Sequence, residues 1–171
     1  MRRMQRALAL LSGVGMMWMA HPAMAIPPES TDWEGGTADE PDVFENACGD
    51  GVDLIGEFVE RGTDTVFFDA EGTPIRVVSH VLFDGTMTRS DTGNSLRDPG
   101  RFVVTVDLTT GYLTIRGLYW NIVYPGVGQV YHSVGRSVFT GADLAERIFM
   151  AGHSDFAAGK DLFEEVCSAL A

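Results

Sequence analysis

The sequence predicts an all-β fold: an antiparallel meander of about seven to eight strands that closes into a small β-barrel, with a short C-terminal helix. Runs of β-branched and aromatic residues recur between Gly-, Pro-, Asn- and Asp-rich turns over residues 52–151. The period changes only in residues 160–170, where apolar residues recur at helical spacing. Closure into a barrel is expected because it removes the exposed edges of the sheet.

The first 25 residues have the composition of a secretory signal peptide. A basic start with Arg2, Arg3 and Arg6 precedes a mostly apolar run, residues 7–20, and the small-residue site Ala23-Met24-Ala25. We therefore expect cleavage after Ala25 and secretion of the remaining 146 of the 171 residues, a length suited to one domain. The apolar run is too short for a membrane span, and no later segment reaches spanning length.

Acidic residues outnumber basic ones in the chain as a whole, which carries 24 Asp and Glu against 12 Lys and Arg. Nucleic acids and anionic membranes bind proteins through a basic face, so the charge argues against both as partners. Residues 26–47 contain no basic residue, and we expect them to form a disordered acidic leader. This leader is interpreted as a spacer or, alternatively, as a partner-binding tail that uses Trp33 and Phe44. The β-barrel domain is then residues 48–171.

The two cysteines, Cys48 and Cys167, bracket almost the whole predicted domain. In the oxidising environment of a secreted protein, two cysteines most simply form one disulfide. The alternative is a reactive thiol, which would need a nearby base that the sequence does not indicate. A disulfide here would tie the C-terminal helix to the start of the first strand of the domain.

Seven strands are expected in the domain, and turn signals separate most of them. Three precede the centre of the chain, and residues 102–139 hold three more around two hairpin turns. The expected segments are 52–59, 63–69, 74–88, the three runs within 102–139, and 146–151, with further turns at 91–94 and at Asp98-Pro99-Gly100.

The two central hairpins predict which side chains share a face. A turn at Thr110-Gly111 pairs Leu108 with Leu113, and a turn over residues 125–128 pairs Val123 with Val130. Alternate residues of a strand share a face, so both registers select one core face. Its apolar members are Phe102, Val104, Val106, Ile115, Val123, Val130, Val134 and Val138. The opposite face carries Leu118, Trp120, Ile122 and Tyr131, which we expect to lie beneath the C-terminal helix.

Four polar residues fall on the predicted core face and are the candidate ligand-binding residues: Tyr119, Asn121, His132 and Arg136. A buried guanidinium must be paired or solvated, so Arg136 and His132 are candidates to bind the carboxylate of a partly apolar ligand inside the barrel. The alternative is a filled core, in which Arg136 pairs with an acid such as Glu57 or Asp69. In that arrangement Asn121 would hydrogen-bond to His132.

The chain contains no Gly-x-Ser-x-Gly nucleophile elbow, no phosphate-binding loop and no His-Glu-x-x-His motif. The three histidines beyond the signal peptide lie on separate elements, so we expect no metal and no cofactor, and we assign no catalytic residue. Three functions remain open. The first is a secreted barrel that binds a small apolar or anionic ligand. The second is a cofactor-independent enzyme of the cyclase or isomerase type that uses the same cavity. The third is a structural or interaction module with a filled core.

Several segments give the chain a resemblance to a family of secreted bacterial proteins of uncharacterised function. They extend from Cys48 to Ala171 and include Phe67–Gly72, Ser79-His80, Phe83–Thr86, Thr92–Ser95, Asp98–Gly100, Gly117–Phe139 and Cys167–Leu170. The resemblance implies a small β-barrel in one secreted unit and implies no particular reaction. At the level of the fold, this architecture is similar to that of allene oxide cyclase and dirigent-like barrels, a likeness that transfers no chemistry.

Overall fold

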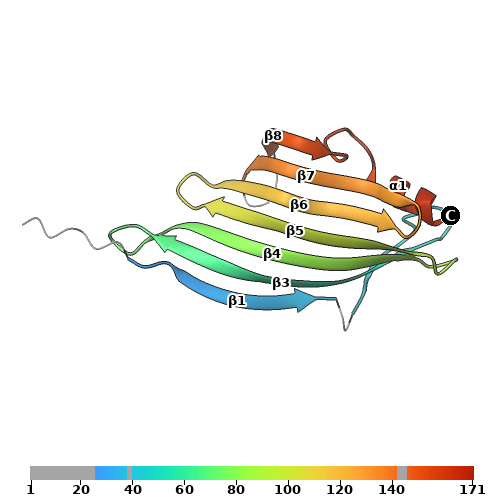
Figure 1. Cartoon of the computed structure of the whole chain (residues 1–171), viewed down its shortest axis with the longest axis horizontal. Helices are drawn as coiled ribbons and strands as arrows, with labels where there is room; N and C mark the ends of the chain where they lie inside the picture. The colour runs from blue at the N-terminus through green and yellow to red at the C-terminus, as the bar shows by residue number, and fades with distance from the viewer. Residues whose placement is uncertain (1–25, 38–39, 142–145) are drawn as a thin grey trace, which may run out of the picture.

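The computed structural model describes residues 26–37, 40–141 and 146–171, and the predicted signal peptide lies outside them. The described residues form one antiparallel sheet of eight strands and one C-terminal helix (Figure 1). The elements are β1 Glu29–Gly36, β2 Asp42–Phe44, β3 Leu54–Phe68, β4 Pro74–Arg89, β5 Ser95–Asp107, β6 Tyr112–Tyr124, β7 Gly128–Thr140, β8 Glu146–Ser154 and α1 Leu162–Leu170.

The sheet follows the order of the chain, which confirms the predicted antiparallel meander. Its strand order is β1-β3-β4-β5-β6-β7-β8, and the short β2 also pairs with β3. Strands β1 and β8 form the two edges of the sheet (Figure 1). Among the described residues no hydrogen-bonded pairing joins these two edges, so closure into a barrel is not confirmed.

The segment predicted to be a disordered leader contains two strands, β1 and β2, so the expectation of disorder is wrong for them. Strand β1 pairs antiparallel with β3 along all eight of its residues. The indole N–H of Trp33, in β1, donates a hydrogen bond to the Asp64 carboxylate over 2.9 Å, and the indole ring lies against Gly62 on β3. An edge strand can keep acidic side chains in solvent while its backbone pairs, so composition alone misled the prediction.

The C-terminal helix covers one end of one face of the sheet, which we call the helix-side face. There the sheet residues Leu54, Leu96, Ile122 and Tyr131 pack with Val166 and Leu170 of α1 into a buried core. The placement of Ile122 and Tyr131 beneath the helix agrees with the expectation from the hairpin pattern. Burial raises the pKa of the Tyr131 phenol to about 12, and its hydroxyl group makes no hydrogen bond to any described residue.

Register in the first central hairpin differs from the prediction by two residues. Val106 pairs with Leu113 and Val104 pairs with Ile115, because the loop between the strands is longer than two residues. A shift by two residues leaves every side chain on its predicted face. Phe102, Val104, Val106 and Ile115 therefore share one face, as expected. It is the helix-side face, so the prediction that the helix covers the opposite face, with Leu118, is wrong.

A β-bulge at Tyr119 reverses the predicted faces in the second hairpin. Leu118 pairs with Val134 whereas Trp120 pairs with Ser133, so Tyr119 is an extra residue of β6. Beyond an extra residue the in–out alternation changes phase. The prediction is consequently wrong for three of the expected core residues, Val123, Val134 and Val138, which lie on the opposite face. Val130 lies at a further register shift in β7 and packs against the core beneath the helix.

The same extra residue of β6 shifts its register with β5, opposite the segment Asp98-Pro99-Gly100 where the sequence indicated a turn. These residues belong to the strand, and the register with β6 shifts between Arg97 and Arg101. Proline cannot donate to a strand ladder and is tolerated at bulges. The Asp98 carboxylate accepts a hydrogen bond from the backbone N–H of Asn121 over 2.9 Å. A side chain thus replaces a backbone partner where the ladder is interrupted.

Three glycines face one another across the sheet next to the Tyr119 bulge. Gly117 pairs with Gly135, and Gly135 pairs with Gly152. Their φ angles are +126°, +140° and +113°, a region that L-residues rarely adopt. A Cβ on Gly117 would lie 2.6 Å from the carbonyl oxygen of Arg101. Adjacent backbones therefore approach too closely along this glycine row for any side chain.

The predicted disulfide is confirmed. Cys48 and Cys167 are bonded with their Cα atoms 5.3 Å apart, within the ordinary range, and the bridge joins α1 to the segment before β3. None of the helices in the described part of the chain has the length and apolar character needed to span a membrane.

Candidate functional site

A cavity of about 470 Å³ opens on the helix-side face, next to the core beneath α1. Its volume is in the range typical of small-molecule sites. The residues that line it come from β3 to β8 and from the segment after β8. They are Glu60, Phe83, Asp98, Phe102, Ile115, Tyr119, Trp120, Ser137, Phe139, Arg147 and Phe156.

Aromatic rings form most of the wall of this cavity. Trp120 lies between Tyr131 of the core and Phe156, with ring centroids 5.8 Å away in each case. Phe83 stacks on Phe58 of β3 at 5.4 Å. Rings held by their neighbours in this way give a large apolar surface whose shape is set before a ligand arrives.

A few polar side chains interrupt the aromatic wall. The Tyr119 hydroxyl lies 3.3 Å from the Ser137 hydroxyl, and the Arg147 guanidinium lies over the Phe156 ring at 5.4 Å. Arg147 forms no ion pair with a described acidic residue. A cation held on a ring rather than by a carboxylate keeps its hydrogen-bond donors free for an anionic or carbonyl group.

Asp98 is the buried acid of the cavity. Only 4% of it is exposed, and the hydrogen bond from Asn121 is the one that its carboxylate receives from the described residues. Burial raises the pKa of the Asp98 carboxyl above its ordinary value, and the Asn121 hydrogen bond opposes that rise only in part. A carboxyl group with a raised pKa inside an apolar cavity can exchange a proton with a bound molecule.

The structure does not bring the four predicted ligand-binding residues together. Tyr119 lines the cavity, but Asn121, His132 and Arg136 do not. The amide of Asn121 accepts a hydrogen bond from Gln129 over 2.7 Å, and the His132 ring stacks on His153 at 5.4 Å. The bulge at Tyr119 explains this result, since it turns Asn121 and His132 away from the helix-side face.

Arg136 is exposed and lies over the Phe149 ring at 5.6 Å. The alternative of a structural ion pair with Glu57 or Asp69 is not observed. Nor does Asn121 bond to the His132 side chain, although the two residues are register partners. Ligand binding by Asn121, His132 and Arg136 stays a prediction.

Most of the cavity residues were missed by the sequence reasoning, among them Asp98, Arg147 and Phe156. Asp98 was assigned to a turn, although a proline inside a β-type run can also indicate a bulge. Arg147 and Phe156 belong to segments with no motif, and only the tertiary fold brings them to β5 and β6. In the described residues no group of three or more His, Cys, Asp or Glu side chains is arranged to hold a metal ion.

Comparisons of the chain with family models, with curated proteins and with solved structures find no match.

Proposed function

We propose that this protein binds a small, largely apolar molecule that carries one anionic or hydrogen-bonding group, in the aromatic cavity of the helix-side face. The observation that carries the proposal is the combination of a 470 Å³ apolar cavity with a guanidinium, Arg147, that no described carboxylate neutralises. The aromatic wall would hold the apolar body of the ligand, and Arg147 and Tyr119 would orient its polar group.

Two fluorescent probes of similar shape test this proposal: the anionic 1-anilinonaphthalene-8-sulfonate and the neutral N-phenyl-1-naphthylamine. Both are expected to bind and to quench Trp120, which lies in the cavity wall. Arg147→Gln should weaken binding of the anionic probe about tenfold, because a charge-assisted hydrogen bond contributes roughly 1.5–3 kcal/mol. The same variant should leave binding of the neutral probe nearly unchanged. Fluorescence titration of the purified protein measures both affinities.

Arg76→Gln is the matched control for charge, since Arg76 lies over the Phe67 ring at 4.3 Å and does not line the cavity. It removes the same charge and should change neither affinity. Failure of both probes to quench tryptophan fluorescence would contradict the proposal. Equal weakening of the anionic probe by both variants would attribute its binding to general electrostatics.

A second candidate function is a cofactor-independent isomerisation or cyclisation in the same cavity. The observation that favours it is the position of Asp98, a buried acid with a raised pKa in the wall of the cavity. In such a reaction Asp98 would donate or accept the proton that moves on the substrate, while Tyr119 would donate a hydrogen bond to a developing oxyanion.

The raised pKa of Asp98 gives a test that needs no substrate. Between the ordinary Asp pKa, near 3.8, and the raised value, the folded protein binds more protons than the unfolded chain. Ionisation of Asp98 therefore lowers the free energy of unfolding as pH rises through this window. Asp98→Asn keeps an oxygen that can accept from Asn121 but does not ionise. Urea denaturation at several pH values should show the variant gaining stability relative to the parent as pH rises from below 3.8. Parallel pH profiles would contradict the assignment.

The proposal includes export of the protein, with cleavage after Ala25, and binding of the ligand outside the cell. The Cys48–Cys167 disulfide supports this location, because such bonds persist in oxidising compartments. The intact mass of the exported protein should correspond to a chain that begins at Ile26. A mass that includes residues 1–25 would contradict cleavage. Closure of the sheet into a barrel stays a prediction.

A further inference from the structure

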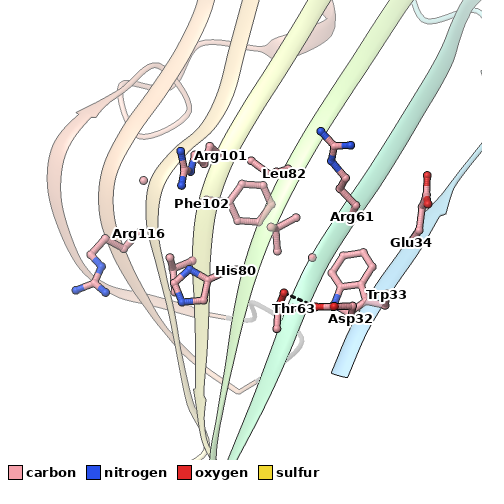
Figure 2. A pocket seen from close by; sticks show the side chains of 14 residues that line it. Asp32, Trp33, Glu34, Arg61, Thr63, His80, Leu82, Arg101, Phe102 and Arg116 are labelled. Atoms are coloured by element: carbon pink, nitrogen blue, oxygen red, sulfur yellow. Dashed lines mark hydrogen bonds between the residues drawn. The ribbon is translucent and has the colours of Figure 1, made fainter. Parts of the chain in front are cut away.

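A second cavity lies on the opposite face of the sheet, which we call the outer face. It is a groove of about 820 Å³ that crosses β1, β3, β4, β5 and β6. Two rows of side chains run across its strands. In one row, Leu82 pairs with Arg61 on one side and Arg101 on the other. In the next row, Val103 pairs with His80 on one side and Arg116 on the other. Figure 2 shows these side chains around the groove, with Arg116 at one end and Arg61 towards the other.

The groove concentrates cations on an otherwise acidic protein. Of the nine Lys and Arg residues beyond Arg6, three form ion pairs with described residues, namely Arg89, Arg97 and Lys160. Arg61, Arg101 and Arg116 form no ion pair with the described residues, and all three line the groove. Their guanidinium groups retain the fork of donors that binds phosphate, sulfate and carboxylate groups.

Two of the arginines on the outer face are direct cross-strand neighbours. Arg116 of β6 pairs in register with Arg136 of β7. Like charges directly opposite each other on a sheet are destabilising, and no described carboxylate lies within 4.0 Å of either guanidinium. An anion bound between these strands would turn this repulsion into attraction, so the pair favours a binding role for this end of the groove.

The spacing of the arginines limits the kind of anion. Arg61 and Arg101 are separated by one strand, so their Cα atoms are about 10 Å apart. Arg116 lies diagonally from Arg101 on the adjacent strand, at a Cα separation of roughly 7–8 Å. These separations suit a molecule with two or three anionic groups. A large polyanion is disfavoured because the whole chain has a formal net charge of −12.

Acidic side chains of β1 close the other side of the groove. Asp32 and Glu34 line it, and Asp32 accepts a hydrogen bond from Thr63 over 2.6 Å (Figure 2). Neither forms an ion pair with the groove arginines. The acidic wall would repel an anion from the β1 side and direct it towards Arg101 and Arg116.

We propose that the outer-face groove is a binding site for a small organic or inorganic anion with two or more phosphate, sulfate or carboxylate groups, held by Arg101 and Arg116 with Arg61. Leu82, of which 40% is exposed, lies between Arg61 and Arg101 and would contact the uncharged part of the ligand. This site lies on the opposite face from the aromatic cavity and is independent of the function proposed for it.

Isothermal titration calorimetry of the purified full chain at about 0.15 M ionic strength, where the Debye length is about 8 Å, tests the site with two probes, sodium tripolyphosphate and citrate. We expect saturable binding of at least one of them. Arg101→Gln and Arg116→Gln should each weaken it by about tenfold or more, because each removes charge-assisted hydrogen bonds. Tighter binding of tripolyphosphate would identify a phosphate-type ligand, and tighter binding of citrate a carboxylate ligand.

Arg76→Gln is the matched control, since Arg76 is an exposed arginine that does not line the groove. It should leave the affinity for both probes within about twofold of the parent, as expected for screened charges beyond the site. Equal weakening by all three variants would overturn the proposal in favour of general electrostatic attraction. Absence of saturable binding of either probe to the parent protein would also overturn it.

Discussion

Replacing both Cys48 and Cys167 with Ala is expected to lower the free energy of unfolding by about 5 kcal/mol. The two residues are 119 positions apart in the sequence, and in the chain-entropy model a bridge across a loop of this length restricts the unfolded chain by about that amount. Urea denaturation followed by circular dichroism measures the difference between the variant and the oxidised parent.

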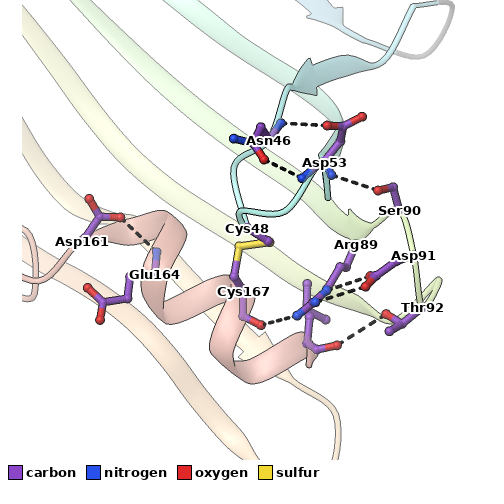
Figure 3. Close-up of a disulfide and its surroundings, with 12 residues drawn as sticks. Asn46, Cys48, Asp53, Arg89, Ser90, Asp91, Thr92, Asp161, Glu164 and Cys167 are labelled. Carbon is purple, nitrogen blue, oxygen red and sulfur yellow. Dashed lines mark hydrogen bonds and ion pairs between the residues drawn. A yellow bond between two sulfur atoms is a disulfide. The ribbon is translucent and has the colours of Figure 1, made fainter.

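Hydrogen bonds also attach α1 to the sheet next to the disulfide, and they allow the contribution of the disulfide to be measured separately (Figure 3). The Arg89 guanidinium donates a hydrogen bond to the Cys167 carbonyl oxygen over 3.1 Å, and the Asn94 amide donates to the Leu170 carbonyl oxygen over 3.1 Å. These contacts do not depend on the disulfide. Asn94→Ala in the oxidised parent should therefore cost only about 1 kcal/mol. A double cysteine variant that loses less than about 1 kcal/mol would contradict the expected role of the bridge.

A methyl group added to the glycine row is expected to produce the second large effect. Gly135→Ala should lower the free energy of unfolding by about 3 kcal/mol or more, through two causes. Its φ of +140° is strained for any L-residue, at a cost of about 1–3 kcal/mol. A Cβ would also overlap the carbonyl oxygen of Ala151 and lie 2.9 Å from the Cα atom of Gly152. Thermal and urea denaturation measure the loss.

Gly126→Ala separates the two causes. Gly126 has a φ of +81°, and no atom lies within 4 Å of a Cβ built there. This variant carries the backbone strain without the overlap and should lose only about 1 kcal/mol. If both variants lose the same amount, the close approach of the backbones along the glycine row contributes nothing to stability.

The sequence predicts the order of the strands in the sheet and the facing of side chains in the first central hairpin, because both depend on local patterns. Alternation and turn signals are enough to place Phe102, Val104 and Ile115 on one face, and an error of two residues in the loop does not disturb them. The cysteine pairing was equally accessible, since only Cys48 and Cys167 are present.

The residues of the candidate site were largely unpredictable, because one extra residue in β6 determines which side chains face the cavity. No composition signal marks Tyr119 as a bulge, yet this bulge turns Trp120 towards the cavity and turns Asn121 and His132 away from it. The β1 strand was missed for a related reason. Its stability depends on pairing with β3 and on the packing of Trp33 over Gly62, which composition does not report.

The disulfide also determines how the folded chain would carry mechanical tension. A force applied to the two ends of the described chain would first peel β1 and β2 from β3, since both precede Cys48. It would then pass through the sulfur–sulfur bond from Cys48 to Cys167 and bypass strands β3 to β8. With roughly 3.4 Å of extended length per residue, about 400 Å of chain is withheld from stretching until the bond is reduced. With the disulfide intact the protein thus extends only by the segment before Cys48, and after reduction it can extend by strands β3 to β8 as well.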